Sequence, residues 1–195
     1  MKIESIAVYC GSSRGTDPVF AEAAEQLGAL LAGHDIDVVY GGGRVGLMGV
    51  LADAVLAAGG RVHGVITAAL VDSEIAHEEL TSLAVVDTMH ERKAAMADRA
   101  DAFIAMPGGF GTLDEFFEMV TWAQLGIHRK PCGILDIAGF FAPLRTFVDT
   151  ATNFGFIHEE HRDSLVIAED PGEIIGALAS WVPTYVPKWV DPNTR

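Results

Sequence analysis

Short apolar runs and longer amphipathic segments follow one another in a regular order along the chain. The runs without helical periodicity predict strands at residues 3–10, 36–40, 61–66, 83–86, 102–106, 132–136 and 164–168. Segments with apolar residues every three or four positions predict helices at residues 18–32, 45–58, 89–100, 113–125, 140–151 and 171–181. Residues 67–81 are polar and acidic and predict a loop with a short helix.

Strands that alternate with helices and are apolar on both faces are typical of a parallel sheet covered by helices on both sides. We therefore predict an α/β fold, a Rossmann-like doubly wound parallel sheet. The chain length of 195 residues fits one domain, which we place at residues 1–182. Residues 183–195 contain three prolines and predict an extended arm.

Composition narrows the possible partners. A formal net charge of −14 argues against nucleic acid and against anionic membranes, because both are bound through basic surfaces. An anionic small ligand must therefore be held by local donors. The chain opens without a signal peptide and has no run long enough to span a bilayer, so we expect a cytoplasmic protein. Cys10 and Cys132 lie in predicted strands and are expected to be buried thiols, not a disulfide.

The most informative stretch joins the predicted strand at 102–106 to the helix that follows. Gly108, Gly109 and Gly111 lie in this turn, and Glu115 lies one turn into the helix. Glycines let an anion approach backbone N–H groups, and a helix N-terminus adds roughly half a positive charge. We call residues 107–112 the phosphate turn. The alternative is structural: Thr112 and Glu115 have the spacing of a capping box, and the glycines then only make a tight turn.

Two further turns favour the ligand-binding interpretation. Gly42 and Gly43 follow the strand at 36–40, and Gly11 and Ser12 follow the first strand. In open parallel sheets, ligands bind beyond the carboxyl ends of the strands, where all three turns are expected to lie. Neither of the two glycine-rich turns, after residues 40 and 106, matches a P-loop or a Gly-x-Gly-x-x-Gly dinucleotide motif, so ATPase and dehydrogenase functions are not favoured.

The seven histidines do not predict a metal site. His158 and His161 are one helical turn apart, but Glu159 and Glu160 between them favour a solvated turn. His77 and His90 lie in polar segments without a set of ligands. We expect neither a metal nor a cofactor.

Several motifs together resemble the LOG ("lonely guy") family. They are Cys10-Gly11-Ser12, Tyr40-Gly41-Gly42-Gly43, Gly46-Leu47-Met48-Gly49, Glu91-Arg92-Lys93, Pro107-Gly108-Gly109-x-Gly111-Thr112-x-x-Glu115 and Thr121-Trp122-Ala123-Gln124-Leu125-Gly126. The resemblance covers about residues 6–168. It implies a cytokinin riboside 5′-monophosphate phosphoribohydrolase, which releases the base and ribose 5-phosphate from a nucleotide. It also implies a homodimer, with the site completed near the subunit boundary.

The resemblance assigns residues to the site. Arg92 and Glu115 match the catalytic pair of the family. The substrate-contacting positions fall on Glu74, Arg92, Lys93, Gly108, Gly109, Phe110, Gly111, Thr112, Leu113, Asp114, Glu115 and Thr121. It leaves adenine and an isopentenyl-substituted adenine open as the base, a choice that depends on the pocket beside residues such as Met96 and Trp122.

Chemistry supports the role of the carboxylate. Cleavage of a glycosidic bond builds positive charge on the ribose, which an ionised carboxylate stabilises. The dipole of its helix favours the ionised form of Glu115. A non-hydrolytic nucleotide-binding or sensor protein on the same fold is the alternative. A lysine decarboxylase is a third interpretation, and it needs a lysine free to form a Schiff base with pyridoxal phosphate; the chain has only Lys2, Lys93, Lys130 and Lys188.

Overall fold

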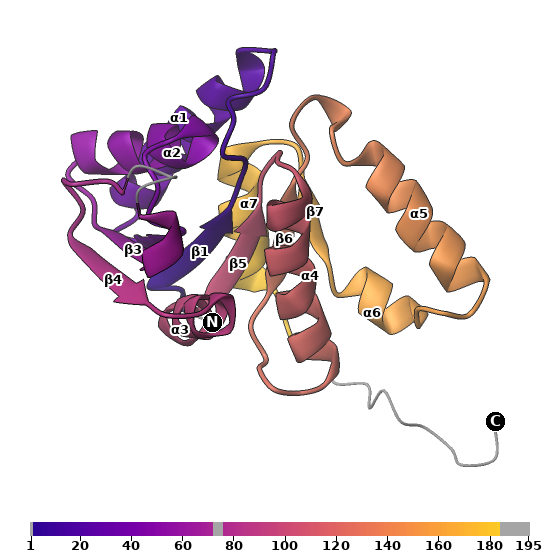
Figure 1. Cartoon of the computed structure of the whole chain (residues 1–195). Coiled ribbons are helices and arrows are strands. Elements are labelled where there is room, and N and C mark those ends of the chain that lie inside the picture. Colours follow the sequence, from indigo (N-terminus) through magenta and orange to yellow (C-terminus); the bar gives the residue numbers. More distant parts are fainter. Residues whose placement is uncertain (1, 72–75, 184–195) are drawn as a thin grey trace.

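A computed structural model describes residues 2–71 and 76–183 of the chain. Its centre is a seven-stranded sheet whose neighbouring strands all pair in parallel, with helices on both faces (Figure 1). The strands are β1 Ser5–Tyr9, β2 Asp37–Tyr40, β3 Val62–Thr67, β4 Ser82–Val86, β5 Ala102–Ala105, β6 Cys132–Leu135 and β7 Val166–Ala168. Their order across the sheet is β4-β3-β2-β1-β5-β6-β7. The predicted fold class is confirmed.

Two layers of helices bury the faces of the sheet. The α-helices are α1 Val19–Gly33, α2 Gly46–Ala57, α3 Met89–Arg99, α4 Phe110–Gln124, α5 Ala142–Asn153, α6 Glu159–Asp163 and α7 Pro171–Ser180, with 3₁₀ turns η1 Ala68–Leu70 and η2 Ile137–Gly139. Alternate residues of β1 show the layering: Ile6 and Val8 pack in the core with α1, α2 and α7, whereas Ala7 and Tyr9 pack in the core with α3 and α4. Within the described residues, none of the helices is both long and apolar enough to cross a membrane.

The strand order reverses its direction of growth at β1, which lies between β2 and β5. The crossovers therefore diverge at the carboxyl ends of β1 and β5, and this divergence opens a crevice in doubly wound sheets. Residues 10–12 and the phosphate turn both lie at this point, as the sequence predicts. The two turns touch: Gly11 N donates to Pro107 O at 3.0 Å.

Most of the predicted strands and helices are confirmed. Each strand begins and ends within two residues of its predicted bounds. The capping box at the start of α3 is present, since Thr88 Oγ1 accepts from Glu91 N at 3.2 Å and Glu91 Oε2 accepts from Thr88 N at 3.1 Å. Cys10 and Cys132 are both buried free thiols, as expected. Burial raises the pKa of the Cys132 thiol to about 12.

Four local predictions are wrong. The edge strand β4 is not covered on both sides as expected, because its apolar residues Leu83 and Val85 are exposed. The helix expected from residue 140 begins at Ala142, after η2, where Ala138 has φ +54°. The pair Asp17-Pro18 predicts Asp17 as the N-cap and Pro18 as the first helical residue, but Pro18 is the N-cap of α1, and Asp17 Oδ1 accepts from Val19 N at 3.0 Å. The predicted solvated turn around His161 is the short helix α6, and His161 is buried.

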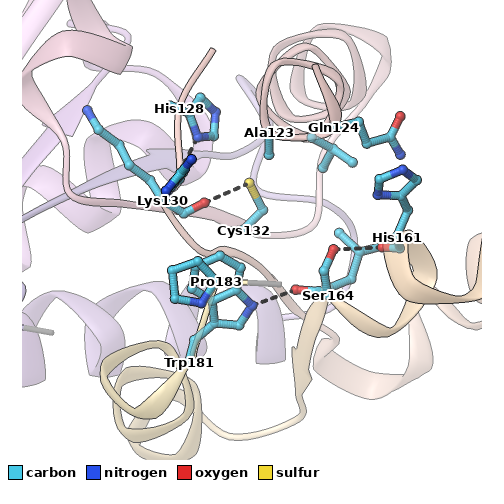
Figure 2. Close-up of a pocket in the computed structure, with 12 residues that line it drawn as sticks. Ala123, Gln124, His128, Lys130, Cys132, His161, Ser164, Trp181 and Pro183 are labelled. Atoms are coloured by element: carbon cyan, nitrogen blue, oxygen red, sulfur yellow. Dashed lines mark hydrogen bonds between the residues drawn. The ribbon is translucent and has the colours of Figure 1, made fainter. Parts of the chain in front are cut away.

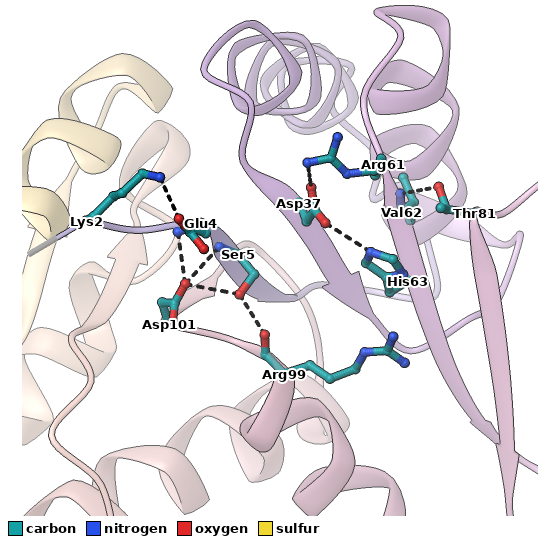
Figure 3. A network of polar contacts seen from close by, with 10 residues as sticks. All are labelled: Lys2, Glu4, Ser5, Asp37, Arg61, Val62, His63, Thr81, Arg99 and Asp101. Atoms are coloured by element: carbon teal, nitrogen blue, oxygen red, sulfur yellow. Dashed lines mark hydrogen bonds and ion pairs between the residues drawn. The ribbon is translucent and has the colours of Figure 1, made fainter.

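A polar network ties the strands together at the opposite, amino edge of the sheet (Figure 3). Asp37 on β2 binds Arg61 at 2.7 Å and His63 Nε2 on β3 at 3.1 Å. Burial disfavours the charge on Asp37, but these two partners outweigh it and lower the pKa of Asp37. Asp101 accepts from the backbone N–H of Glu4 and of Ser5, at 2.9 and 3.1 Å.

Candidate active site

The phosphate turn presents its backbone to solvent at the start of α4. Gly109 is the N-cap, and Gly109, Phe110 and Gly111 are all exposed. A Cβ added to Gly109 or Gly111 would meet no atom within 4 Å, so this face of the turn is open. Gly108 is required for another reason: its Cβ would lie 2.2 Å from Thr112 Oγ1 and 2.9 Å from Gly11 N. The first turn of α4 thus offers unpaired N–H groups and the positive end of a 15-residue helix dipole.

The capping-box alternative for this helix is wrong. α4 begins at Phe110, three residues before the predicted start, so Thr112 lies inside the first turn and no side chain caps the helix. Apolar periodicity missed this start because the first helical residues, Phe110 and Gly111, are exposed. The result removes the structural explanation of the Thr112–Glu115 spacing.

A pocket lies in the crevice between the first turn and the phosphate turn. The residues that line it are Gly11, Ser12, Ser13, Arg14, Gly15, Phe20, Leu47, Pro107, Gly108, Gly109 and Phe140. Four predicted site residues, Gly11, Ser12, Gly108 and Gly109, therefore share one cavity wall. The N-terminus of α2 borders the same pocket, since Leu47 N donates to Gly11 O at 3.0 Å.

Arg92 projects from the first turn of α3 into the interior, and its side chain is only 5 % exposed. Its Nε donates to Val65 O on β3 at 3.0 Å, and Nη2 donates to Gly41 O at 3.2 Å. Both acceptors are neutral, so they fix the guanidinium in place without cancelling its charge. Gly41 has no room for a side chain here, because a Cβ would lie 2.1 Å from Nη2.

The third nitrogen of this guanidinium faces the expected catalytic carboxylate. Arg92 Nη1 lies 3.8 Å from Glu115 Oε1, and the Glu115 side chain is 13 % exposed. Glu115 projects from α4 one turn beyond Gly111. The packing of α3 and α4 on the same face of the sheet thus brings the predicted catalytic pair together beside the open phosphate turn.

Tyr9 lies close to this pair and was missed by sequence reasoning. It ends β1, is 1 % exposed, and packs against Phe103 with ring centroids 6.4 Å apart. Burial, with a further contribution from the Glu115 carboxylate, raises the pKa of Tyr9 well above its ordinary value. The available signal was a phenol at the last residue of the strand that leads into Gly11 and Ser12.

Lys93, the neighbour of Arg92, is held by two carboxylates of α4. Its Nζ lies 3.2 Å from Asp114 Oδ2 and 3.0 Å from Glu118 Oε2, and its side chain is 8 % exposed. Burial lowers the pKa of Lys93, but the hydrogen bonds with Glu118 and Asp114 outweigh it and the net pKa is raised. This ion-paired group connects α3 to α4, one residue from the catalytic pair.

The structure does not bring every predicted residue to this place. Thr121 is exposed further along α4, where its hydroxyl donates to Phe117 O at 2.7 Å. Gly42 and Gly43 face the chain that follows the 72–75 segment, since Gly42 O accepts from His77 N and Gly43 pairs with Ala76. Glu74 lies outside the described residues.

Met96 and Trp122, the two residues expected beside the base, differ from each other in burial. Met96 is completely buried in the core beneath α3 and has no surface for a ligand. Trp122 is partly buried and packs against the same core. Leu113 also packs there, whereas Phe110 is 94 % exposed beside the phosphate turn.

A different pocket lies between the second half of α4, the start of β6 and the end of α7 (Figure 2). Its polar groups largely bind one another: Trp181 Nε1 donates to Ser164 O, Ser164 Oγ donates to His161 O, and Lys130 N donates to His128 Nδ1. None of the predicted site residues that the structure describes lines it. It is therefore not the site that the motifs describe.

The fold and the site together define a Rossmann-like protein in which an open glycine turn at the switch point adjoins a buried arginine–glutamate pair. A family model described as "possible lysine decarboxylase" matches residues 48–178. Cytokinin riboside 5′-monophosphate phosphoribohydrolase LOG of Oryza sativa is 46 % identical over 94 % of this chain and 76 % of its own length. LOG7 of Arabidopsis thaliana, with the same enzyme name, is 48 % identical over 94 % of this chain and 85 % of its own. The chain belongs to the LOG family.

Solved structures show the same fold at lower identity. The molybdenum cofactor binding protein of Rippkaea orientalis superposes with a TM-score of 0.69 at 22 % identity, over 92 % of this chain and 98 % of its own. A molybdenum cofactor carrier protein of Chlamydomonas reinhardtii superposes with a TM-score of 0.70 at 19 % identity, over the same shares of the two chains. These likenesses support the architecture of the sheet and its helices.

We predict that Lys93→Ala destabilises the protein by about 2 kcal/mol, because it leaves the Glu118 carboxylate in a partly buried place without its cation. The raised pKa of Lys93 means that the contribution is complete at neutral pH and is lost as the pH rises through the folded-state pKa. Urea unfolding at pH 7 measures the change. Lys2→Ala, which removes the exposed Lys2–Glu4 pair, serves as the control and leaves the unfolding midpoint unchanged. Equal midpoints for Lys93→Ala and wild type contradict this role for Lys93.

Proposed function

We propose that this protein hydrolyses the N-glycosidic bond of cytokinin riboside 5′-monophosphates or of AMP, and releases the free base and ribose 5-phosphate. The observation that carries the proposal is the Arg92–Glu115 pair, 3.8 Å apart and one helical turn from an open phosphate turn. Family membership supports the same reaction, since the curated relatives bear this enzyme name. The protein is accordingly an enzyme, a phosphoribohydrolase.

The phosphate turn supplies the binding energy for the 5′-phosphate in this scheme. The N–H groups at the start of α4 belong to exposed residues, Phe110 and Gly111, and they lie at the positive end of the helix dipole. The same backbone leads directly into the helix that carries Glu115. A nucleotide held by its phosphate at this turn therefore has its ribose within reach of the carboxylate.

Glu115 acts on the ribose. As the bond between C1′ and the base breaks, positive charge develops on the ring, and a fixed carboxylate stabilises it. Water adds to C1′, its proton is released, and the departing base takes up a proton. The mainly buried position of Glu115 strengthens its attraction to the developing charge, because few water molecules screen it.

Arg92 acts on the base and on Glu115. Its guanidinium is held by two backbone carbonyls, so it needs no rearrangement when the substrate arrives. Its positive charge stabilises the negative charge that develops on the departing base. Its Nη1 also lies 3.8 Å from Glu115 Oε1, where the two opposite charges attract each other.

The reaction predicts a strict dependence on the phosphate. Purified protein should release base from isopentenyladenosine monophosphate or AMP, and the unphosphorylated ribosides should react at least about 100-fold more slowly, because they lack the group that the turn binds. Chromatography of the products measures the release. Equal release from ribosides contradicts the phosphate turn, and binding of AMP without any release favours the sensor alternative.

The division of roles predicts that Arg92→Ala and Glu115→Gln each lower kcat by about 100-fold or more, because each removes a charge that acts in the transition state. Glu173→Gln on α7 makes the same chemical change as Glu115→Gln away from the site, and it keeps wild-type kcat. Steady-state kinetics with the better monophosphate measures all three. If Glu115→Gln keeps most of its turnover while Arg92→Ala loses it, the role given to Glu115 is wrong.

The decarboxylase interpretation does not fit the lysines that the structure describes. Lys93 is ion-paired with two carboxylates, which hold it in the protonated form. Lys130 donates to Ala97 O at 2.7 Å, and Lys2 lies at the exposed amino end. A Schiff-base lysine needs a neutral amine, so these environments oppose that chemistry.

We also propose that the enzyme is a cytoplasmic homodimer. Two free buried thiols support a reducing compartment.

Support for a dimer comes from an apolar groove beside α5, lined by residues that include Phe117, Leu144 and Ile167. Large apolar side chains are also exposed, at 66–86 %: Phe147, Phe154 and Phe156. Light scattering should give about twice the chain mass of 20.8 kDa. A mass of one chain at micromolar concentration contradicts the dimer.

A further inference from the structure

His77 lies within the loop predicted at residues 67–81, yet its imidazole is completely buried. Its Nε2 lies 3.0 Å from Asp53 Oδ1 on α2, and its Nδ1 accepts from Glu79 N at 3.2 Å. A backbone N–H can only donate, so Nδ1 carries no proton in this arrangement. The proton is therefore on Nε2, which donates to the Asp53 carboxylate. Both nitrogens of a neutral imidazole are used.

The backbone at His77 is joined to the second glycine turn. His77 N donates to Gly42 O at 3.0 Å, and the preceding residue, Ala76, pairs with Gly43 in an antiparallel bridge. The imidazole thus connects this turn to α2, a helix whose inner face is buried in the core.

The same glycine turn holds Arg92. Gly41 O is one of the two carbonyls that accept from its guanidinium. Gly42, the next residue, has φ +81°, a conformation that side chains rarely adopt. A shift of residues 41–43 therefore moves a carbonyl that determines where the Arg92 charge lies.

We propose that the His77–Asp53 pair is a positioning device for Arg92: it fixes the glycine turn at residues 41–43, whose carbonyl holds the guanidinium. The proposal rests on the proposed function, in which Arg92 is catalytic. An apolar side chain at position 77 would fill the space at a lower desolvation cost. Unlike an apolar side chain, the imidazole also fixes the orientation of this segment, because its hydrogen bonds to Asp53 on α2 and to the backbone N–H of Glu79 are directional.

Asp53 gives the cleanest test, because its side chain is 55 % exposed and its removal leaves no buried cavity. Asp53→Ala should lower kcat about 10- to 100-fold while KM changes little, because Arg92 is displaced from the position that the transition state requires. Asp53→Asn keeps an oxygen acceptor for Nε2–H and should restore kcat to within about threefold of wild type. His77→Ala should reproduce the loss if it folds.

A second His–Asp pair provides the matched control. Asp37 binds His63 at 3.1 Å at the amino edge of the sheet and also binds Arg61, so Asp37→Ala removes more polar contacts than Asp53→Ala (Figure 3). Asp37→Ala should keep wild-type kcat despite its lower stability. If Asp53→Ala keeps wild-type kcat, or if both alanine variants lose kcat equally, the positioning role is overturned.

A readout without catalysis separates this inference from the proposed function. Amide hydrogen exchange at residues 41–43 should become faster in Asp53→Ala and stay unchanged in Asp37→Ala, because only the first loosens the turn. Unchanged exchange in both overturns the inference. Arg92→Ala, measured in parallel, tests the proposed function by itself: full activity in that variant contradicts the role of Arg92, while the exchange result still decides whether the pair fixes the turn.

Discussion

The close approach of two chain turns at the carboxyl ends of β1 and β5 is the constraint on which the site depends. Gly11 N and Pro107 O are 3.0 Å apart, and Gly108 meets Gly11 and Thr112 at distances that exclude any side chain. Gly46 is equally confined, since its Cβ would lie 2.2 Å from the Ser12 backbone. The reversal of strand order at β1 creates the crevice, and these glycines let three segments share it.

Charge is arranged locally in a protein whose net charge is −14. Lys93 is balanced by two carboxylates, so it strengthens the contact between α3 and α4 without making the site more positive. Arg92 is held by two neutral carbonyls, which do not cancel its charge, and its Nη1 faces Glu115 Oε1 at 3.8 Å. The backbone N–H groups of α4 add a positive potential that no titration removes. A protein that repels anions overall can therefore bind a phosphate at this point.

The sequence predicted the architecture well because the physical signal was repeated along the chain. Apolar runs separated by amphipathic helices identify a parallel sheet, and glycines at the strand ends identify the binding edge. The Thr88–Glu91 capping box was readable because both partners are local. The start of α4 was not, because Phe110 and Gly111 are exposed and have no apolar periodicity.

Contacts between distant segments were beyond the sequence. Arg92 binds Val65 and Gly41, which lie 27 and 51 residues away, and His77 binds Asp53 at a separation of 24. From the sequence alone, His77 in its polar, acidic loop is expected to be solvated, because its partner Asp53 is brought close only by the fold. The motif placed Arg92 and Glu115 in one site, whereas only the arrangement of α3 and α4 on one face of the sheet shows that the two side chains face each other.

The most direct test is a crystal structure of Glu115→Gln with AMP bound. The account predicts the phosphate on the N–H groups of residues 109–112, with the ribose C1′ facing residue 115 and the glycosidic nitrogen facing Arg92. A phosphate bound elsewhere, or a ribose turned away from both side chains, contradicts the account of this site.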